Sequence, residues 1–296
     1  MADPRLLLSR WIAASRPRTL PLAVAPVLVG IALAAFETGG LAPATALATL
    51  LAAVAIQIGT NLHNDASDFE RGTDTEDRLG PERAAAQGWF TARQVKRAAH
   101  LAFLTALLLG ILLTLRGGWP ILLLGIASLV AGYAYTGGPR PIAYGPLGEL
   151  FVLFFFGIAA LTGSYYLQTL TFAPTALALG VALGLPAAAV LTLNNYRDRE
   201  TDRVAGRRTL CFYLGPRGTR LLYASLLLIP FPLLYLLDLP GSRWPLVAAL
   251  PFGAWLISRV AGGATGVALN PLLGATALFQ SALAVLLILG FALPSA

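Results

Sequence analysis

The chain has 296 residues, of which 57% are hydrophobic and only 12% are charged, and its formal net charge is +7. Soluble domains carry about 25% charged residues, so this composition excludes an ordinary soluble domain and favours an integral membrane protein. The single cysteine excludes an internal disulfide and a cysteine-based zinc site.

Long stretches of the chain contain no Asp, Glu, Lys or Arg. In chain order they are 19–36, 38–64, 98–115, 117–139, 150–196, 221–237, 244–258 and 260–296. A helix that spans a bilayer needs about 20 apolar residues, and the stretch 150–196 is long enough for two. The stretches do not alternate in polarity as barrel strands do, so we expect an all-α fold with about nine transmembrane helices. We expect residues 1–296 to form a single membrane domain.

The basic residues predict the orientation of these helices. With nine spans, one side of the membrane holds the N-terminus and the loops after spans 2, 4, 6 and 8, and that side carries 19 of the 21 Lys and Arg residues. Only Arg116 and Arg243 fall on the other side. The positive-inside rule therefore predicts a multi-pass protein of the plasma (inner) membrane with a cytoplasmic N-terminus. Because the basic residues flank spans, they indicate topology and not nucleic-acid binding.

The acidic residues are concentrated just after spans 2 and 6. Ten of the fourteen lie in two short segments, 65–82 and 198–202. After span 2, a helical period of about 100° per residue places Asn61, Asn64, Asp65 and Asp68 on one face of about 100°. The topology of a membrane protein does not require acids at this position, so the cluster indicates a binding site.

The second segment repeats this arrangement after span 6, where Asn194, Asn195, Asp198 and Asp202 share one face. Two facing carboxylate clusters would repel each other unless hard cations lay between them, and Mg²⁺ typically binds one or two carboxylates together with substrate phosphates. The sequence therefore predicts a magnesium-assisted diphosphate site on the cytoplasmic face, with Asp68, Asp198 and Asp202 as its catalytic carboxylates. The candidate metal ligands are Asn64, Asp65, Asp68, Asp74, Asn195, Asp198 and Asp202. The arginines that could bind the remaining phosphate oxygens are Arg71, Arg78, Arg83, Arg140, Arg207 and Arg208.

These two segments resemble the Asp-rich motifs of the UbiA superfamily of membrane prenyltransferases. The first segment reads NDASD at 64–68 and RGTD at 71–74, and the second reads NYRDRETD at 195–202 and GRRTL at 206–210. The resemblance implies a helical fold, usually of nine spans, with both motifs on cytoplasmic loops after spans 2 and 6. It also implies a prenyl diphosphate donor and Mg²⁺.

Smaller motifs resemble the branch of this superfamily that prenylates 1,4-dihydroxy-2-naphthoate in menaquinone synthesis. Gly72 stands where many members have a third Asp, and the acid is Asp74 instead. Further matches are RPRTL at 16–20, PVLVG at 26–30, GPER at 80–83, YTGGP at 135–139, GELF at 148–151 and GSYYLQ at 163–168. The resemblance implies transfer of a polyprenyl group from polyprenyl diphosphate to the naphthoate, with loss of diphosphate and CO₂ to give demethylmenaquinone. It covers roughly residues 10–215, and the last three helices carry no recognisable motif.

The remaining candidates concern the acceptor and the allylic cation that forms when diphosphate leaves. Aromatic faces stabilise cations by about 0.5–2 kcal/mol each, arginines could bind the acceptor carboxylate, and an acid at the start of span 5 could orient the substrate or move a proton. The candidates for this pocket are Arg16, Arg18, Asn61, Tyr133, Tyr135, Tyr144, Glu149, Tyr165 and Tyr166. The arginines among them could equally be topology anchors, and the tyrosines could be packing or interface residues.

Two alternatives stay open at this point. One is a prenyltransferase for another aromatic acceptor, such as 4-hydroxybenzoate, homogentisate or a tetrapyrrole. The other is a secondary transporter, which would place polar groups near the bilayer midplane; the uncharged stretches argue against it, although Gln57 and Gln168 keep it open. A CDP-lipid alcohol phosphotransferase is disfavoured because its motif begins with Asp-Gly, a dipeptide that this chain does not contain. The sequence does not predict an oligomeric state.

Overall fold

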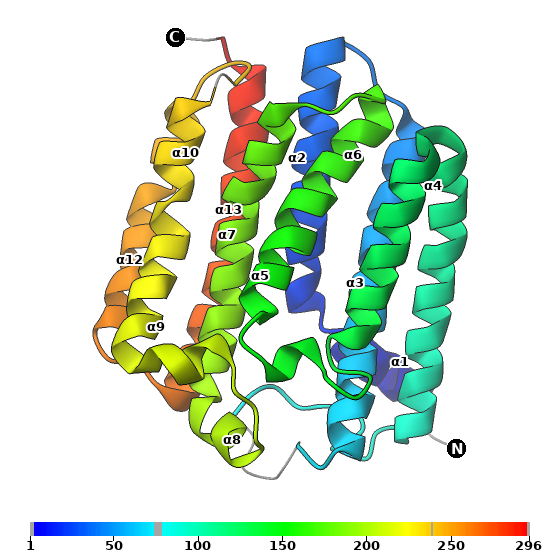
Figure 1. Cartoon of the computed structure of the whole chain (residues 1–296), viewed down its shortest axis with the longest axis vertical. Helices are drawn as coiled ribbons and strands as arrows, with labels where there is room; N and C mark the ends of the chain where they lie inside the picture. The colour runs from blue at the N-terminus through cyan, green and yellow to red at the C-terminus, as the bar shows by residue number, and fades with distance from the viewer. Residues whose placement is uncertain (1–2, 74–78, 238, 295–296) are drawn as a thin grey trace.

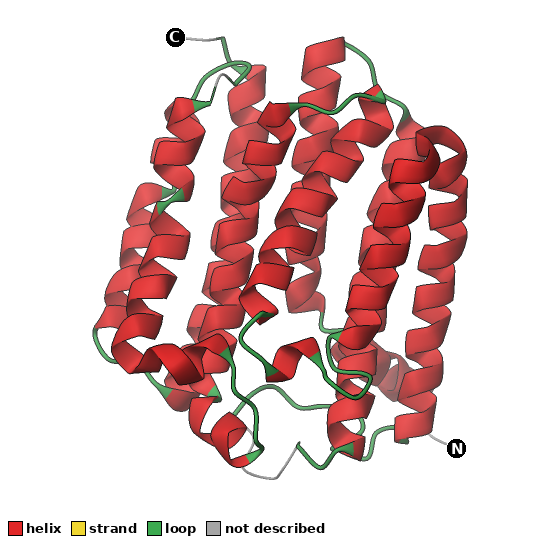
Figure 2. Ribbon diagram, viewed as in Figure 1, coloured by secondary structure: helices red, strands yellow, loops and turns green. Residues whose placement is uncertain are grey.

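The computed structural model describes residues 3–73, 79–237 and 239–294, and all regular structure in these ranges is helical (Figure 2). Eight helical segments are long and apolar enough to cross a membrane. One of them, α4 (Ala92–Ala134), is two helices that meet at Gly118, whose φ of 67° and ψ of −158° interrupt the helix. The described residues therefore contain the nine spans expected from the sequence, and the two ends of the chain lie at opposite ends of the bundle (Figure 1).

The spans follow one another with short connections. In chain order they are α2 (Leu20–Thr38), α3 (Pro43–Glu70), the two arms of α4, α5 to α6 (Gly148–Leu153 and Ala160–Thr169), α7 (Pro174–Arg197), α9 with α10 (Leu210–Leu228 and Pro230–Leu236), α11 with α12 (Trp244–Val247 and Leu250–Ala261) and α13 (Asn270–Ala292). Local sequence fixes several helix starts. Pro43 and Pro174 begin α3 and α7, where proline costs no hydrogen bond. Thr91 and Gln94 form a capping box at the start of α4.

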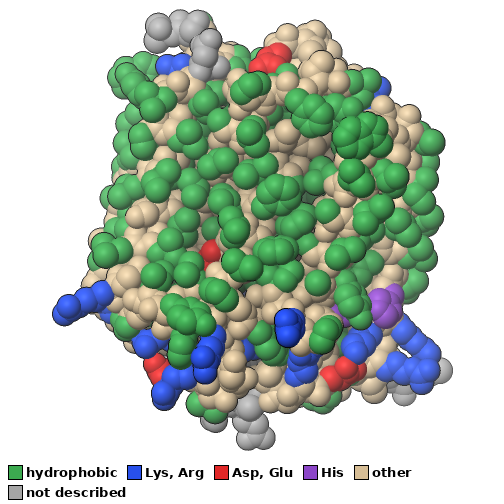
Figure 3. Space-filling model, in the orientation of Figure 1, with side chains coloured by type: hydrophobic (Ala, Val, Ile, Leu, Met, Phe, Trp, Pro, Cys, Tyr) green, Lys and Arg blue, Asp and Glu red, His purple; other side chains and the backbone are tan. Residues whose placement is uncertain are grey.

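The outer surface is apolar over most of the height of the helices, and Lys and Arg gather at the end that holds the N-terminus (Figure 3). An apolar surface this extensive is stable only in contact with lipid. The charged end is also where α1 (Pro4–Ala14) and α8 (Arg199–Val204) lie (Figure 1). We refer to it as the polar end, and to the opposite end as the far end.

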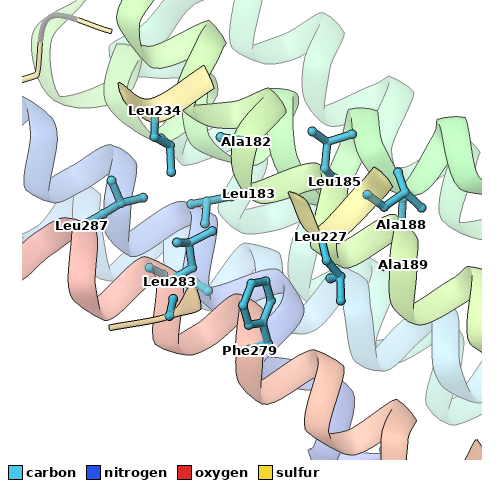
Figure 4. Close-up of a cluster of buried hydrophobic side chains, with 14 of the residues drawn as sticks. Ala182, Leu183, Leu185, Ala188, Ala189, Leu227, Leu234, Phe279, Leu283 and Leu287 are labelled. Carbon is cyan, nitrogen blue, oxygen red and sulfur yellow. The ribbon is translucent and has the colours of Figure 1, made fainter. Parts of the chain in front are cut away.

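Helix α7 forms the centre of the bundle and packs against α5, α9 and α13. Leu183 of this helix forms part of a large buried cluster with Leu227, Leu234, Phe279 and Leu283 (Figure 4). This cluster connects the last three spans to the rest of the bundle.

Helix α7 also approaches the π-helical segment Phe154–Ala159, which joins α5 to α6, at backbone distance. A Cβ atom on Gly157 would lie only 2.3 Å from the carbonyl oxygen of Gly180 and 2.4 Å from the Cα of Gly184. Small residues at such a crossing let helices pack closely in a membrane.

The polar end is built from helix ends and loops. Helix α3 runs past its apolar stretch to Glu70, while α7 ends at Arg197 and the chain continues into α8. The loop before α4 is held from outside by α1, because Trp11 stacks on Phe90 with ring centroids 3.9 Å apart. Both acidic motifs therefore lie at the same end of the molecule, as predicted.

Candidate active site

The first acidic motif occupies the last turns of α3, and its side chains point in two directions. Asn64, Asp65 and Asp68 are all buried. Asn64 and Asp68 line an internal cavity. The carboxylate of Asp65 instead accepts hydrogen bonds from the backbone N–H groups of Ala84 (2.8 Å) and Ala85 (3.1 Å). Asp65 therefore holds the loop before α4 in place and does not face the cavity.

Asp68 lies between two arginines from distant parts of the chain. Arg83 Nη1 is 2.8 Å from one carboxylate oxygen, and Arg207 Nη2 is 2.7 Å from the other. Arg83 also donates to the backbone carbonyl of Asn64 (2.9 Å). The side chain of Asp68 is only 2% exposed, so its charge is balanced almost entirely by these two guanidinium groups.

Arg207 also joins the two motifs. Its Nη1 lies 3.5 Å from the carboxylate of Asp202, and its Nη2 donates to the hydroxyl of Thr73 (3.0 Å). Burial raises the pKa of Asp202 to about 6, because the loss of solvation outweighs the attraction of Arg207. Asp68 and Asp202, one from each motif, thus share a single guanidinium group.

Asp198 is paired with its neighbour Arg197, whose Nη2 is 2.5 Å from the carboxylate. The same guanidinium donates to Oδ1 of Asn194 (2.9 Å) and to Oδ1 of Asn270 (3.0 Å). Asn270 is the first residue of α13, and its Nδ2 donates to the backbone carbonyl of Leu79 (2.8 Å). The last helix therefore connects the second motif to the loop that follows the first. Nothing in the sequence pattern indicated this role for Asn270.

Tyr144, from the loop between α4 and α5, packs against the arginines of both motifs. Its ring centroid is 4.4 Å from Cζ of Arg207 and 5.5 Å from Cζ of Arg71, and its hydroxyl donates to Asp68 (3.4 Å). Arg71 in turn donates to the backbone carbonyl of Gly138 (2.6 Å). Tyr144 thus holds guanidinium groups in place by cation–π contacts and does not line the cavity.

A cavity of about 720 Å³ extends from the carboxylates into the bundle. Its polar end is lined by Asp68, Asp198, Asp202 and Arg207, and its walls are mostly apolar side chains of α2, α3, α4, α6 and α7. Toward the far end the walls are Leu113, Ile121 and Leu167, which pack together in a buried cluster. Near this cluster Arg116 donates to the backbone carbonyls of Leu167 (2.7 Å) and Gln168 (3.1 Å). The cavity therefore combines a charged end with a long apolar interior.

Two buried side chains hold the asparagines that open the motifs. Glu149 accepts a hydrogen bond from Nδ2 of Asn195 (2.9 Å), and Thr136 donates to Oδ1 of Asn64 (2.6 Å). Both asparagines line the cavity, whereas Glu149 lies behind Asn195 and does not. The prediction of Glu149 as a wall residue of the pocket therefore does not match its position.

Among the other predicted pocket residues, Arg16, Arg18, Asn61 and Tyr135 line the cavity. Asn61 Nδ2 donates to the hydroxyl of Thr19 (3.0 Å), and Gln57 Nε2 also lies within hydrogen-bond distance of that hydroxyl (3.3 Å). Gln57 is one helical turn before Asn61 on the same face of α3, so this periodicity is the signal that could have identified it as a cavity residue.

Two predicted tyrosines lie away from the site. Tyr165 and Tyr166 are near the end of α6, where the Tyr165 hydroxyl donates to Glu37 (2.5 Å) and the Tyr166 hydroxyl donates to the carbonyl of Gly117 (3.1 Å). Both partners belong to the far end, because span 5 begins at the polar end and crosses the bundle before it reaches these residues. Tyr133 is half exposed and packs on His63, with ring centroids 4.4 Å apart.

The remaining predicted residues are not gathered around the carboxylates. Arg140 and Arg208 are exposed, and the guanidinium of Arg208 lies over the ring of Phe212. Asp74 and Arg78 lie outside the described residues. In the part of the chain that the structure describes, no three acidic, His or Cys side chains converge on one point. Arginines separate the carboxylates instead.

Comparisons with known proteins agree with this geometry. The family model described as "UbiA prenyltransferase family" matches residues 23–262. The chain belongs to the UbiA prenyltransferase family. Among UbiA relatives, the chain is 41% identical to 1,4-dihydroxy-2-naphthoate octaprenyltransferase of Escherichia coli strain K12, an alignment that covers 74% of this chain and 72% of the relative. It is 38% identical to the protein of the same name from Mycobacterium tuberculosis, over 91% and 92% of the two chains.

The fold is also that of UbiA proteins of known structure. A UbiA homologue from Archaeoglobus fulgidus, bound to DMAPP and Mg²⁺, superposes with a TM-score of 0.69 at 17% sequence identity. The alignment covers 96% of this chain and 99% of the homologue.

Proposed function

We propose that this protein transfers a polyprenyl group from polyprenyl diphosphate to 1,4-dihydroxy-2-naphthoate, with loss of diphosphate and CO₂, to give demethylmenaquinone. The observation that carries the proposal is that Arg207 joins Asp68 and Asp202, one residue from each motif, at the polar end of a long apolar cavity. A diphosphate with an apolar tail matches this combination of charge and shape. The names of the relatives at 41% and 38% identity support the naphthoate acceptor.

The residues present fit a divalent cation. Asp68, Asp198, Asp202 and Asn195 all line the polar end of the cavity, and carboxylate and amide oxygens are the ligands that Mg²⁺ prefers. Mg²⁺ bound there would supply positive charge to the leaving diphosphate. Asp65 is less suited to this role than the sequence suggested, because it does not line the cavity and its carboxylate accepts two backbone hydrogen bonds from the loop before α4.

The arginines of the chain would bind the diphosphate. Arg83 and Arg207 are fixed on either side of Asp68 and both line the cavity, so two guanidinium groups would lie beside a diphosphate bound at its polar end. Donors held in place before the reaction stabilise charge as it develops, without reorganisation. The apolar walls would bind the prenyl chain and exclude water from the allylic cation.

The acceptor would approach from the side of the cavity lined by Arg16, Arg18 and Asn61. A guanidinium group there is suited to the carboxylate of the naphthoate. Tyr135 also lines this region and can offer its ring face to the cation.

The proposal treats residues 1–296 as one prenyltransferase domain in the plasma (inner) membrane, with the polar end in the cytoplasm. The strong bias of Lys and Arg toward that end supports this orientation. A cytoplasmic site would also face the compartment from which a polar aromatic acid can be supplied.

The test is an assay of purified protein in nanodiscs with 1,4-dihydroxy-2-naphthoate, a polyprenyl diphosphate, and either Mg²⁺ or EDTA. We expect demethylmenaquinone by mass spectrometry only with Mg²⁺. Prenylation of 4-hydroxybenzoate or another ring in place of the naphthoate would refute the proposed acceptor but would still support the proposed diphosphate site. Absence of any prenylation by folded protein would refute the proposed reaction.

A further inference from the structure

The two asparagines that open the motifs are held in different ways. Asn195 is held through its amide nitrogen by the carboxylate of Glu149, and Asn64 is held through its carbonyl oxygen by the hydroxyl of Thr136. Among the described residues, neither side-chain carboxamide forms a hydrogen bond with another residue of its own motif. Because both asparagines line the cavity, the end of each carboxamide that is not held is available to a ligand.

The partner of Asn195 permits only one orientation. An ionised carboxylate accepts hydrogen bonds and cannot donate them, so in that form Glu149 can bind only the amide end of Asn195, as the 2.9 Å contact from Nδ2 shows. Rotation of the carboxamide by half a turn would place its oxygen against the carboxylate and leave a buried charge without its hydrogen bond. Glu149 is only 6% exposed, so bulk water is not available to replace that bond. Thr136 differs, because a hydroxyl can donate to the oxygen of Asn64 or accept from its nitrogen.

We propose that Glu149 is a positioning residue that holds the carbonyl oxygen of Asn195 toward the cavity, as a ligand for the divalent cation. This inference rests on the proposed function, since it concerns the metal of that reaction. Only the oxygen of a carboxamide binds Mg²⁺, so the orientation of Asn195 decides whether it can be a ligand. Groups behind a metal ligand commonly fix its orientation in this way.

The surroundings of Glu149 make a sharp substitution possible. Its second oxygen, Oε2, is buried without a hydrogen-bond partner. In Glu149→Gln, a buried N–H without a partner is less tolerable than a buried C=O, so the new amide should place its oxygen at that position and its nitrogen toward Asn195. The nitrogen of the new amide would then attract the oxygen of Asn195 and turn the amide of Asn195 toward the cavity. The substitution thus reverses the hydrogen bond without changing the packing.

Mn²⁺ binding to purified protein in nanodiscs, measured by electron paramagnetic resonance with inorganic pyrophosphate present and no acceptor, tests the inference. We expect Glu149→Gln to weaken Mn²⁺ binding by about 10–100-fold, the usual effect of removing a group behind a metal ligand. The double variant Glu149→Gln with Asn195→Asp should restore binding close to wild type, because the introduced glutamine can donate to one oxygen of the introduced aspartate while the other oxygen faces the cavity.

Two results would overturn the inference. One is unchanged Mn²⁺ binding in Glu149→Gln. The other is a double variant that folds, by its thermal transition, and binds Mn²⁺ as weakly as Glu149→Gln alone, since the loss would then not arise from the orientation of residue 195. Neither measurement uses the aromatic acceptor. The wild-type protein and the variants could therefore bind Mn²⁺ as expected while the wild type fails to prenylate the naphthoate. That result would refute the proposed function and leave the inference about Glu149 intact.

Discussion

Replacement of Asn270 by alanine tests whether the last helix supports the active site. Asn270 makes two hydrogen bonds, one from the guanidinium of Arg197 (3.0 Å) and one to the carbonyl of Leu79 (2.8 Å). A hydrogen bond to a charged group contributes about 1.5–3 kcal/mol and a neutral one about 0.5–1.5 kcal/mol. The substitution should therefore cost about 2–4.5 kcal/mol in total, shared between stability and the geometry of the second motif.

The part that affects the site acts through Arg197, which also holds Asp198. If the site loses only the hydrogen bond to the charged Arg197, the affinity for the metal–diphosphate donor should weaken by about 10–150-fold. We expect a raised KM for the polyprenyl diphosphate and a weaker Mn²⁺ affinity, with a smaller fall in kcat. Asn270→Asp should show a smaller effect, because it keeps the bond to Arg197 and loses only the donor to Leu79.

The control is Ser281→Ala on the same helix, whose hydroxyl bonds only within α13, to the carbonyl of Ala277. It removes a polar group of the last span without touching either motif. If Asn270→Ala and Ser281→Ala lower the thermal transition alike and leave KM and Mn²⁺ affinity at wild-type values, the link from α13 to the site has no functional role.

Three further predictions follow from the site. Asp68→Ala should lower kcat/KM by more than about 100-fold, since it removes a carboxylate that two arginines share, and an active Asp68→Ala variant in the prenylation assay would contradict that role. Tyr144→Leu removes the ring that contacts both Arg207 and Arg71, and should weaken pyrophosphate binding by at least about 2–30-fold, the value of one cation–π contact. Tyr144→Phe should stay near wild type, and equal losses in calorimetry would assign the effect to the hydroxyl. Gly125 lines the cavity, and a Cβ atom at this position would have no neighbouring atom within 4 Å. Gly125→Phe should therefore narrow the interior and reduce turnover of a long prenyl diphosphate more than that of geranyl diphosphate. Equal reductions for both donors, measured by product chromatography, would show that the prenyl chain does not lie there.

The sequence predicted the number of spans and the positions of the motifs because both depend on local patterns. Uncharged stretches reveal helices in a membrane, and the helical period correctly placed Asn61, Asn64 and Asp68 on the cavity side of α3. Asp65 fell at the edge of that same face, where the angle alone cannot tell the cavity from a neighbouring loop. Its two hydrogen bonds to the backbone of that loop decided its direction.

The rest of the site depends on contacts between residues far apart in the chain. The pairing of Glu149 with Asn195 and of Arg197 with Asn270 has no periodic signal, so only the packing of the helices reveals it. The tyrosines at 165 and 166 were grouped with the site because of their chemistry, although they lie near the end of span 5 and thus at the far end. Position along the span was the better guide for these two residues.

The far end of the cavity has a consequence for the energy metabolism of the cell. A cavity inside a membrane protein becomes an ion leak if a continuous column of water connects the two sides of the membrane through it. Such a leak would dissipate the proton-motive force. Leu113, Ile121 and Leu167 are buried apolar side chains that pack together at the far end of the cavity, and apolar packing of this kind excludes the water that ions need. Arg116 fastens the end of α6 to the turn of α4 just beyond them. The packing that lines the cavity would thereby also keep the bilayer electrically insulating.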